Sequence, residues 1–223
     1  TAENPEVEVK QITPQQETFA GYPIPLTGGD NRALTNVSYN DIAGNLFEND
    51  IIKLGEKSIT TGYPDGGFHP LESIERGAMA AYLYRLAGSP EFEAPAESPF
   101  SDVPTTHPFY KEIAWLKATG ITTGWEDGTF RPEDSINREA MAAFFYRAAG
   151  SPEVQQKATF TDVSGSPFVK EISWFQFSKL STGWPDSTFR PHDSVKRDAM
   201  AAYMMRYMGN FDSVKVSAPE PAK

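Results

Sequence analysis

One nine-residue segment occurs three times, and this repetition constrains the fold more than any other feature of the sequence. The copies read GYPDGGFHP at 62–70, GWEDGTFRP at 124–132 and GWPDSTFRP at 183–191. Because a repeat of this spacing is usually one supersecondary unit that packs against its copies, the chain is expected to form three similar units.

The similarity extends to both sides of the nine-residue segment. Upstream, each copy has an aromatic residue followed two positions later by an aspartate. These aspartates are Asp41, Asp102 and Asp162. Downstream, each copy has an arginine and then the run Ala-Met-Ala-Ala. These arginines are Arg76, Arg138 and Arg197. The whole unit is therefore repeated, and we expect three copies of one structure.

Each unit is expected to form two helices joined by the nine-residue segment. Phe109, Ile113 and Leu116 are spaced i, i+4 and i+7, which places them on one stripe of a helix, and the other units keep this spacing. Trp115 and Trp174 lie roughly 120° from that stripe, so they are expected to be only partly covered. The second helices should have equal lengths, with serine N-caps and glycine ends. These residues are Ser73, Ser135 and Ser194, and Gly88, Gly150 and Gly209.

Composition excludes several classes of function. The 223 residues include no cysteine, which excludes disulfides, thiolate zinc sites and a cysteine nucleophile. The net charge of −10 argues against nucleic-acid binding, and no segment reaches the ~20 apolar residues of a membrane span. The sequence begins at Thr1 without a charged and apolar leader. We therefore expect either an exported protein whose signal peptide has been removed or a fragment of a longer protein.

The order of the motifs resembles the S-layer homology family, in three tandem copies. The motifs are F-x-D-V, H-P-F-x-x-E-I, G-I-T-T-G-W-x-D-G-T-F-R-P and I-x-R before an alanine-rich helix. The resemblance implies an all-α fold, in which three helix-loop-helix repeats form a pseudo-threefold helical bundle with grooves between neighbours. It also implies a non-catalytic, secreted cell-surface module that anchors a protein non-covalently to cell-wall polysaccharide, most often a pyruvylated secondary polymer of Gram-positive envelopes.

The predicted organisation places the repeats between two segments of other composition. An irregular N-terminal extension covers 1–35, the repeats cover 36–89, 97–151 and 157–210, and a linker-like tail covers 211–223. The extension could lie as an extended strap on the helices or be mobile.

The second helices depart from the family motif T-R-A-E. The arginine is present, but the acid is moved or lost. The three segments are Arg76-Gly77-Ala78, Arg138-Glu139-Ala140 and Arg197-Asp198-Ala199. The resemblance therefore transfers a role to the arginine but not to the glutamate, and this variant resembles actinobacterial members of the family.

The candidate ligand-binding residues come from the arginine position and from the nine-residue segment. They are Arg76, Arg138, Arg197, Tyr63, Trp125, Trp184, Asp65, Asp127 and Asp186. The arginines could line the grooves and bind a carboxylate such as a pyruvyl ketal, or they could hold a loop carbonyl or pair with the segment's aspartates. The aromatic rings could stack on a sugar or cap the bundle.

The aspartates are more simply explained by local structure. Those of the nine-residue segment are interpreted chiefly as turn formers, and because the third copy has Asp186-Ser187, its turn cannot depend on glycine. The upstream aspartates, Asp41, Asp102 and Asp162, are interpreted as caps of the following helix.

Enzymatic function is not expected. His69, His107 and His192 occupy different repeat positions, and we expect no metal and no cofactor. The alternative to glycan binding is a protein-protein assembly module of a surface layer or of a phage structural component, with other surface proteins as partners. Arginines and aromatics pooled in narrow grooves would favour a glycan, whereas a flat apolar patch would favour protein.

Deletion of one complete repeat tests the shared core that this architecture requires. If the three second helices pack together, loss of any repeat should unfold the whole module, because the remaining repeats lose the surface that buries them. Thermal unfolding followed by circular dichroism measures this, and an unchanged cooperative transition after deletion would contradict the architecture.

Overall fold

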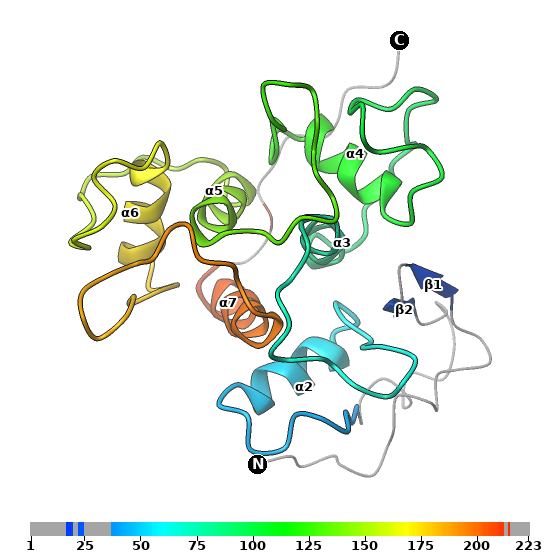
Figure 1. Cartoon of the computed structure of the whole chain (residues 1–223), viewed down its shortest axis with the longest axis horizontal. Helices are drawn as coiled ribbons and strands as arrows, with labels where there is room; N and C mark the ends of the chain where they lie inside the picture. Colours follow the sequence, from blue (N-terminus) through cyan, green and yellow to red (C-terminus); the bar gives the residue numbers. More distant parts are fainter. Residues whose placement is uncertain (1–16, 20–21, 25–36, 212–213, 215–223) are drawn as a thin grey trace. The chain divides into compact units, whose positions relative to one another are not determined.

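The computed structural model describes residues 17–19, 22–24, 37–211 and 214, and within them each repeat forms a pair of helices (Figure 1). The helices are α2 (Glu48–Glu56), α3 (Arg76–Leu86), α4 (Tyr110–Ala118), α5 (Arg138–Ala148), α6 (Val169–Phe177) and α7 (Arg197–Asn210). The predicted all-α repeats are therefore confirmed. Two short antiparallel strands, β1 (Glu17–Phe19) and β2 (Tyr22–Ile24), lie in the N-terminal extension and were not expected.

The chain divides into two compact units. One contains the chain up to Glu72 together with Lys196–Met205, and the other contains Ser73–Val195 and the chain from Arg206. The strap or mobile segment considered for the rest of the extension lies outside the described residues.

The first helix of a repeat packs against the second helix of the preceding repeat, as α4 does on α3 and α6 on α5 (Figure 1). Tyr84 lies edge-on to Trp115 with ring centroids 5.3 Å apart, and Tyr146 lies edge-on to Trp174 at 5.6 Å. Both tryptophans are buried. The expectation that they are only partly covered is wrong, because a tyrosine from the second helix of the preceding repeat covers each indole.

The serines at the start of the second helices are not N-caps. Helix α3 begins after Glu75 and α5 after Asn137, whose side-chain oxygen accepts a hydrogen bond from the Ala140 amide at 2.9 Å. Ser135 and Ser194 instead lie in extended segments that form single β-bridges. The prediction was wrong because the first helical amides find acceptors in another repeat.

Those acceptors are carbonyl groups of the nine-residue segments and the residues just after them. In α3, Arg76 N–H donates to Asp134 O at 2.9 Å and Gly77 N–H donates to Pro132 O at 2.8 Å. Helices α5 and α7 repeat the pattern with other acceptors. These are Asp193 and Pro191 for α5, and Glu72 and Pro70 for α7. A loop of another repeat thus satisfies two amides that a helix N-terminus leaves unpaired.

A closed ring of three backbone hydrogen bonds joins the segments that precede the second helices. Ile74 N–H donates to Val195 O, Val195 N–H to Ile136 O and Ile136 N–H to Ile74 O, at 2.9, 3.0 and 2.9 Å. All three side chains are buried. The pseudo-threefold relation expected from the sequence is therefore present in these segments.

The ends of the second helices differ from one another. Gly88 and Gly150 follow the caps of α3 and α5 with φ of 85° and 88°, as predicted. Helix α7 instead continues through Gly209 and has 14 residues, against 11 in each of the others. Phe211, which directly follows α7, stacks on Tyr207 of that helix with ring centroids 4.8 Å apart.

The upstream aspartates hold the nine-residue loops and do not cap helices. Asp102 accepts hydrogen bonds from the backbone amides of Phe130 at 2.8 Å and Arg131 at 2.7 Å. Asp41 and Asp162 hold the first and third loops through the equivalent amides. The capping prediction was wrong, because the side chain reaches across the repeat to amides 28 and 29 residues away.

Three backbone positions of the loop have a positive φ, and glycine occupies two of them in the second repeat. Gly124 has a φ of 71°, and a Cβ there would come within 2.4 Å of the Phe100 ring, so the packed aromatic excludes any side chain. At the turn, Gly128 has a φ of 83° and Ser187 a φ of 66° in the third copy. The third turn therefore forms without glycine, as predicted, in a conformation that is strained for serine.

In the part of the chain that the structure describes, none of the helices combines the length and hydropathy needed to cross a membrane.

Replacement of Asp102 by alanine tests the loop clamp. The change leaves two backbone amides without their charged acceptor, and we expect the free energy of unfolding to fall by about 3 kcal/mol. Urea denaturation measures this. Glu126→Ala removes an exposed acid from the same loop and should change stability little. Equal losses in the two variants would contradict the clamp.

Candidate functional site

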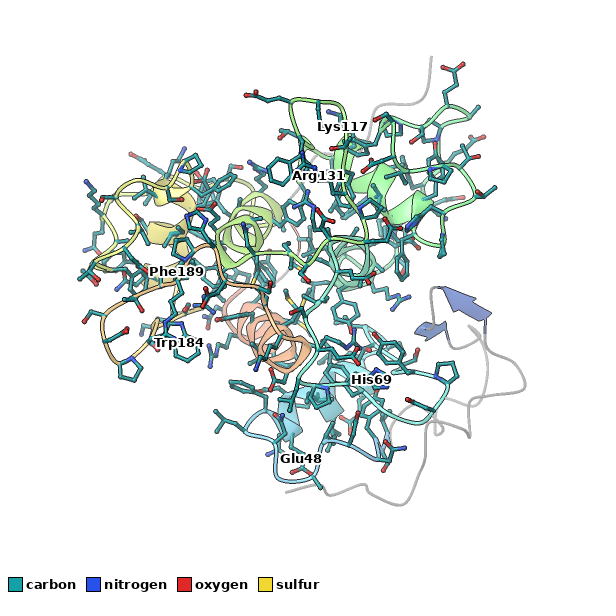
Figure 2. The ribbon with its side chains drawn as sticks, in the orientation of Figure 1. Glu48, His69, Lys117, Arg131, Trp184 and Phe189 are labelled. Carbon is teal, nitrogen blue, oxygen red and sulfur yellow. The ribbon has the colours of Figure 1, made fainter. Side chains whose placement is uncertain are left out.

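The candidate site is built around the aromatic residue that opens each loop. Trp125 and Trp184 are 44% and 42% exposed, although each begins a tightly held turn. Trp125 N–H donates to Thr129 O at 2.8 Å, and Trp184 N–H donates to Thr188 O at 2.9 Å. The backbone thus holds each tryptophan in place while the residue stays partly exposed to solvent, and Trp184 is labelled in Figure 2.

A cation of the same loop lies over each tryptophan. The guanidinium carbon of Arg131 is 4.0 Å from the Trp125 ring centroid, and that of Arg190 is 4.1 Å from Trp184. In the first loop the His69 ring stacks on Tyr63 with centroids 3.8 Å apart. These contacts support one face of each aromatic residue, which the sequence analysis did not foresee.

The loop aspartates form the turns and also hold these cations. Asp127 Oδ1 accepts hydrogen bonds from the Thr129 amide at 3.0 Å and from its hydroxyl at 2.6 Å, while Oδ2 pairs with Arg131 at 3.1 Å. Asp186 makes the same contacts with Thr188 and Arg190. In the first loop, Asp65 bonds Gly67 and His69.

These hydrogen bonds shift the pKa of each aspartate. The side-chain bond from Thr129, followed by its backbone bond, lowers the pKa of Asp127 below 3.8, and Arg131 adds to the effect. Thr188 lowers the pKa of Asp186 in the same order. The bond from the Gly67 amide, followed by that from His69, lowers the pKa of Asp65. Each of these aspartates accepts the backbone amide two residues later, which is the hydrogen bond of a turn-forming aspartate.

The three arginines of the second helices are buried and hold loop carbonyls. Arg76 Nε donates to Phe130 O at 2.8 Å, Arg138 Nε to Phe189 O at 2.6 Å and Arg197 Nε to Phe68 O at 2.8 Å. Of the alternatives left open by the sequence, the bond to a loop carbonyl is therefore present. The loop aspartates form ion pairs with the cations of their own loops.

Each of these arginines also contributes to the surroundings of the exposed aromatic ring. The guanidinium carbon of Arg76 lies 4.7 Å from the Phe130 ring centroid and 5.6 Å from that of Trp125. Arg138 lies 5.9 Å from Trp184, and Arg197 lies 4.9 Å from Tyr63. The predicted arginine and aromatic residues are thus brought together, always from two different repeats.

Burial leaves the Arg76 guanidinium poorly solvated. Desolvation lowers the pKa of Arg76 from its ordinary value to about 10, although Asp134 and Asp102 act in the opposite direction. The side-chain hydrogen bond of Arg76 within the described residues is made by Nε. A cation in this state favours an anionic partner that can meet its terminal nitrogens.

A cavity of about 310 Å³ opens beside Trp125 and Arg76. Its wall also includes Arg147 and Glu139 of α5 and Phe168 at the start of α6. Arg147 donates to Ile121 O at 3.0 Å, and burial lowers its pKa while Glu171 raises it. The sequence did not single out Arg147 as a site residue. Arg147 follows Arg138 by nine residues, which places it on the opposite side of the helix, and nothing in the sequence indicated that this side of α5 faces Arg76.

Glu139 directly follows Arg138, one position earlier than the glutamate of the motif T-R-A-E. Its Oε2 accepts a hydrogen bond from the Ser166 hydroxyl at 2.6 Å, and its Oε1 lies 3.5 Å from His192 Nδ1. The buried carboxylate therefore links α5 to the segment before α6 at the edge of the cavity. Among the described residues, no group of three or more histidine, aspartate or glutamate side chains is arranged to hold a metal ion.

Comparison with known proteins gives the same repeat pattern. The S-layer homology domain model matches residues 38–80, 99–142 and 159–201. Relatives include cell surface glycoprotein 1 and a cellulosome-anchoring protein of Acetivibrio thermocellus, 32% and 31% identical over 65% of this chain. An S-layer protein of Bacillus licheniformis is 31% identical over 77% of the chain. The chain spans only 7%, 34% and 20% of these three relatives.

Replacement of Thr129 by valine tests the electrostatics of the loop. Loss of the hydroxyl removes the largest cause of the lowered pKa of Asp127, which should rise toward 3.8. NMR titration of the carboxyl carbons measures this. Because the pKa is lowered in the fold, its stabilising effect is present above 3.8 and disappears as pH falls through the folded value. Asp186, whose Thr188 is retained, is the internal control, and an unchanged Asp127 would contradict the assignment.

Proposed function

Because this chain belongs to the S-layer homology domain family, we propose that it anchors a protein non-covalently to the cell wall by binding cell-wall polysaccharide. The observation that carries the proposal is the cavity where exposed Trp125 meets Arg76 and Arg147. An aromatic face with nearby polar groups suits a sugar ring, and the protein is then located at the cell surface.

The shape of this site favours a glycan over a protein partner. The tryptophan and both arginines lie in one hollow between helices and do not form a flat apolar patch. Large protein interfaces need a broader surface than a cavity of about 310 Å³ offers. Relatives named as surface, S-layer and anchoring proteins support the same reading.

We further propose that the polysaccharide carries an acidic group that meets Arg76. The guanidinium is buried, its pKa is lowered to about 10 and its side-chain hydrogen bond in the described residues uses Nε. Its terminal nitrogens can therefore bind a carboxylate such as a pyruvyl ketal on the glycan. Asp134 and Glu139, on the cavity wall, can accept hydrogen bonds from sugar hydroxyls.

No catalytic role is needed for this function. An enzyme acting on the same glycan would require a pair of carboxyl groups disposed about a scissile bond. The cavity wall carries two carboxyl groups, Asp134 and Glu139, and Glu139 already accepts a hydrogen bond from Ser166. The chain is therefore proposed as a binding module whose partners are cell-wall polysaccharide and the protein that it anchors.

Replacement of Trp125 by alanine tests this site. We expect affinity for purified Gram-positive cell walls to fall about tenfold, because the stacking surface is lost. Co-sedimentation measures the affinity. Phe177→Ala is the matched control, since Phe177 is 43% exposed, close to the 44% of Trp125, but lies outside the cavity.

The same assay separates the two parts of the proposal. If neither the unmodified protein nor its variants sediment with any wall preparation, glycan anchoring is wrong. If walls depleted of ketal-linked pyruvate by mild acid bind as well as untreated walls, the carboxylate partner of Arg76 is wrong, while anchoring stands.

A further inference from the structure

The loop cation differs among the three repeats. Arg131 and Arg190 occupy this position in the second and third loops, and His69 occupies it in the first. All three adopt the same left-handed backbone, with φ of 60°, 57° and 57°. Each lies 3.8 to 4.1 Å from the aromatic ring that opens its loop. His69 therefore takes the place of a permanent cation with a group that can lose its charge near neutral pH.

Two carboxylates face the imidazole of His69. Its Nε2 lies 2.7 Å from Asp65 Oδ2, and its Nδ1 lies 3.3 Å from Glu72 Oε2. A third acid, Asp41, accepts the backbone N–H of His69 at 2.8 Å. The imidazole is thus placed so that both ring nitrogens point at acceptors, which only the protonated ring can satisfy by donating twice.

The His69 ring also contacts Tyr63, the candidate sugar-stacking residue of the first repeat. The rings of His69 and Tyr63 are nearly parallel, with an interplanar angle of 7°. The Arg197 guanidinium carbon lies 4.9 Å from the Tyr63 ring centroid. Tyr63 therefore has both a permanent charge and a titratable one near its ring.

We infer that His69 positions Tyr63 and makes ligand binding at the first repeat dependent on pH. In the second and third repeats an arginine, which stays charged, holds the equivalent ring at any pH near neutral. The inference rests on the proposed function of these loops in binding cell-wall polysaccharide. As an imidazolium, His69 bonds Asp65 and Glu72 and presents a cation to the tyrosine face. When neutral, one ring nitrogen turns a lone pair toward a carboxylate, so the stacked arrangement loses its support.

The electrostatics of the cluster agree with this geometry. Burial by itself lowers the pKa of His69, but the hydrogen bond and charge of Asp65 and the charge of Glu72 outweigh it and raise the pKa above 6.5. A raised pKa means that the stabilising effect is complete below the unfolded value and disappears as pH rises through the folded one. Tyr63 should accordingly be best positioned at mildly acidic pH.

The experiment compares the unmodified chain with His69→Arg, which installs the cation used by the other two loops. Affinity for purified Gram-positive cell walls is measured at about pH 5.5 and about pH 8.5. We expect the unmodified chain to bind about two- to fivefold more weakly at the higher pH, relative to His69→Arg, as expected for loss of one cation–aromatic contact. The ratio between the two proteins cancels titration of the wall itself.

Two controls make the comparison specific. Arg131→His places histidine in the second loop and should increase the pH dependence. His107→Asn removes a histidine that lies outside the cavity, and asparagine can accept the Phe109 amide as Asn45 accepts the Phe47 amide in the first repeat, so the pH dependence should be unchanged. Equal pH dependence of the unmodified chain and His69→Arg would overturn the inference but leave glycan anchoring intact. Absence of binding by both proteins at both pH values would instead overturn the proposed function.

A measurement on the free protein removes any dependence on the ligand. In NMR titrations of the unmodified chain, the His69 imidazole should titrate above 6.5, and the ring signals of Tyr63 should follow the same curve. A His69 pKa below 6.5, or Tyr63 signals that ignore its titration, would overturn the positioning role.

Discussion

The ring of backbone hydrogen bonds among Ile74, Ile136 and Val195 is the constraint on which the other contacts depend. It sets one residue of each repeat against the other two, directly before the second helix begins. Because each amide and carbonyl in the ring is used once by a different repeat, no repeat can complete its pattern alone. The arginine two positions after each ring residue is thereby brought to the loop of another repeat.

The nine-residue loop has a structural and a binding face as a result. Carbonyl groups on its inner side accept hydrogen bonds from a helix N-terminus and from a buried arginine, and an aspartate accepts hydrogen bonds from its backbone amides. Its outer face presents the aromatic ring, backed by a cation. The rigidity needed for folding also orients the ring that we propose for sugar binding, because both depend on the same short turn.

Local patterns in the sequence were enough for some features and insufficient for others. The helix pairs, the turn role of Asp127 and the glycine-free turn at Ser187 follow from spacing and from local backbone chemistry. The serine caps, the role of Asp102 and the burial of Trp115 did not, because their partners come from elements distant in sequence. A single sequence carries no direct sign of which carbonyl a distant amide or arginine will meet.

By itself, the sequence determined that three similar helical units exist, which residues occupy equivalent positions and which family motifs they form. The tertiary structure decided what those equivalent residues do. It showed that Arg76 holds Phe130 O of the next repeat, and it joined Arg147 to the same cavity. The physical reason is that periodicity specifies a residue's place on its own helix, whereas burial, hydrogen-bond partners and charge environment arise only when separate repeats pack together.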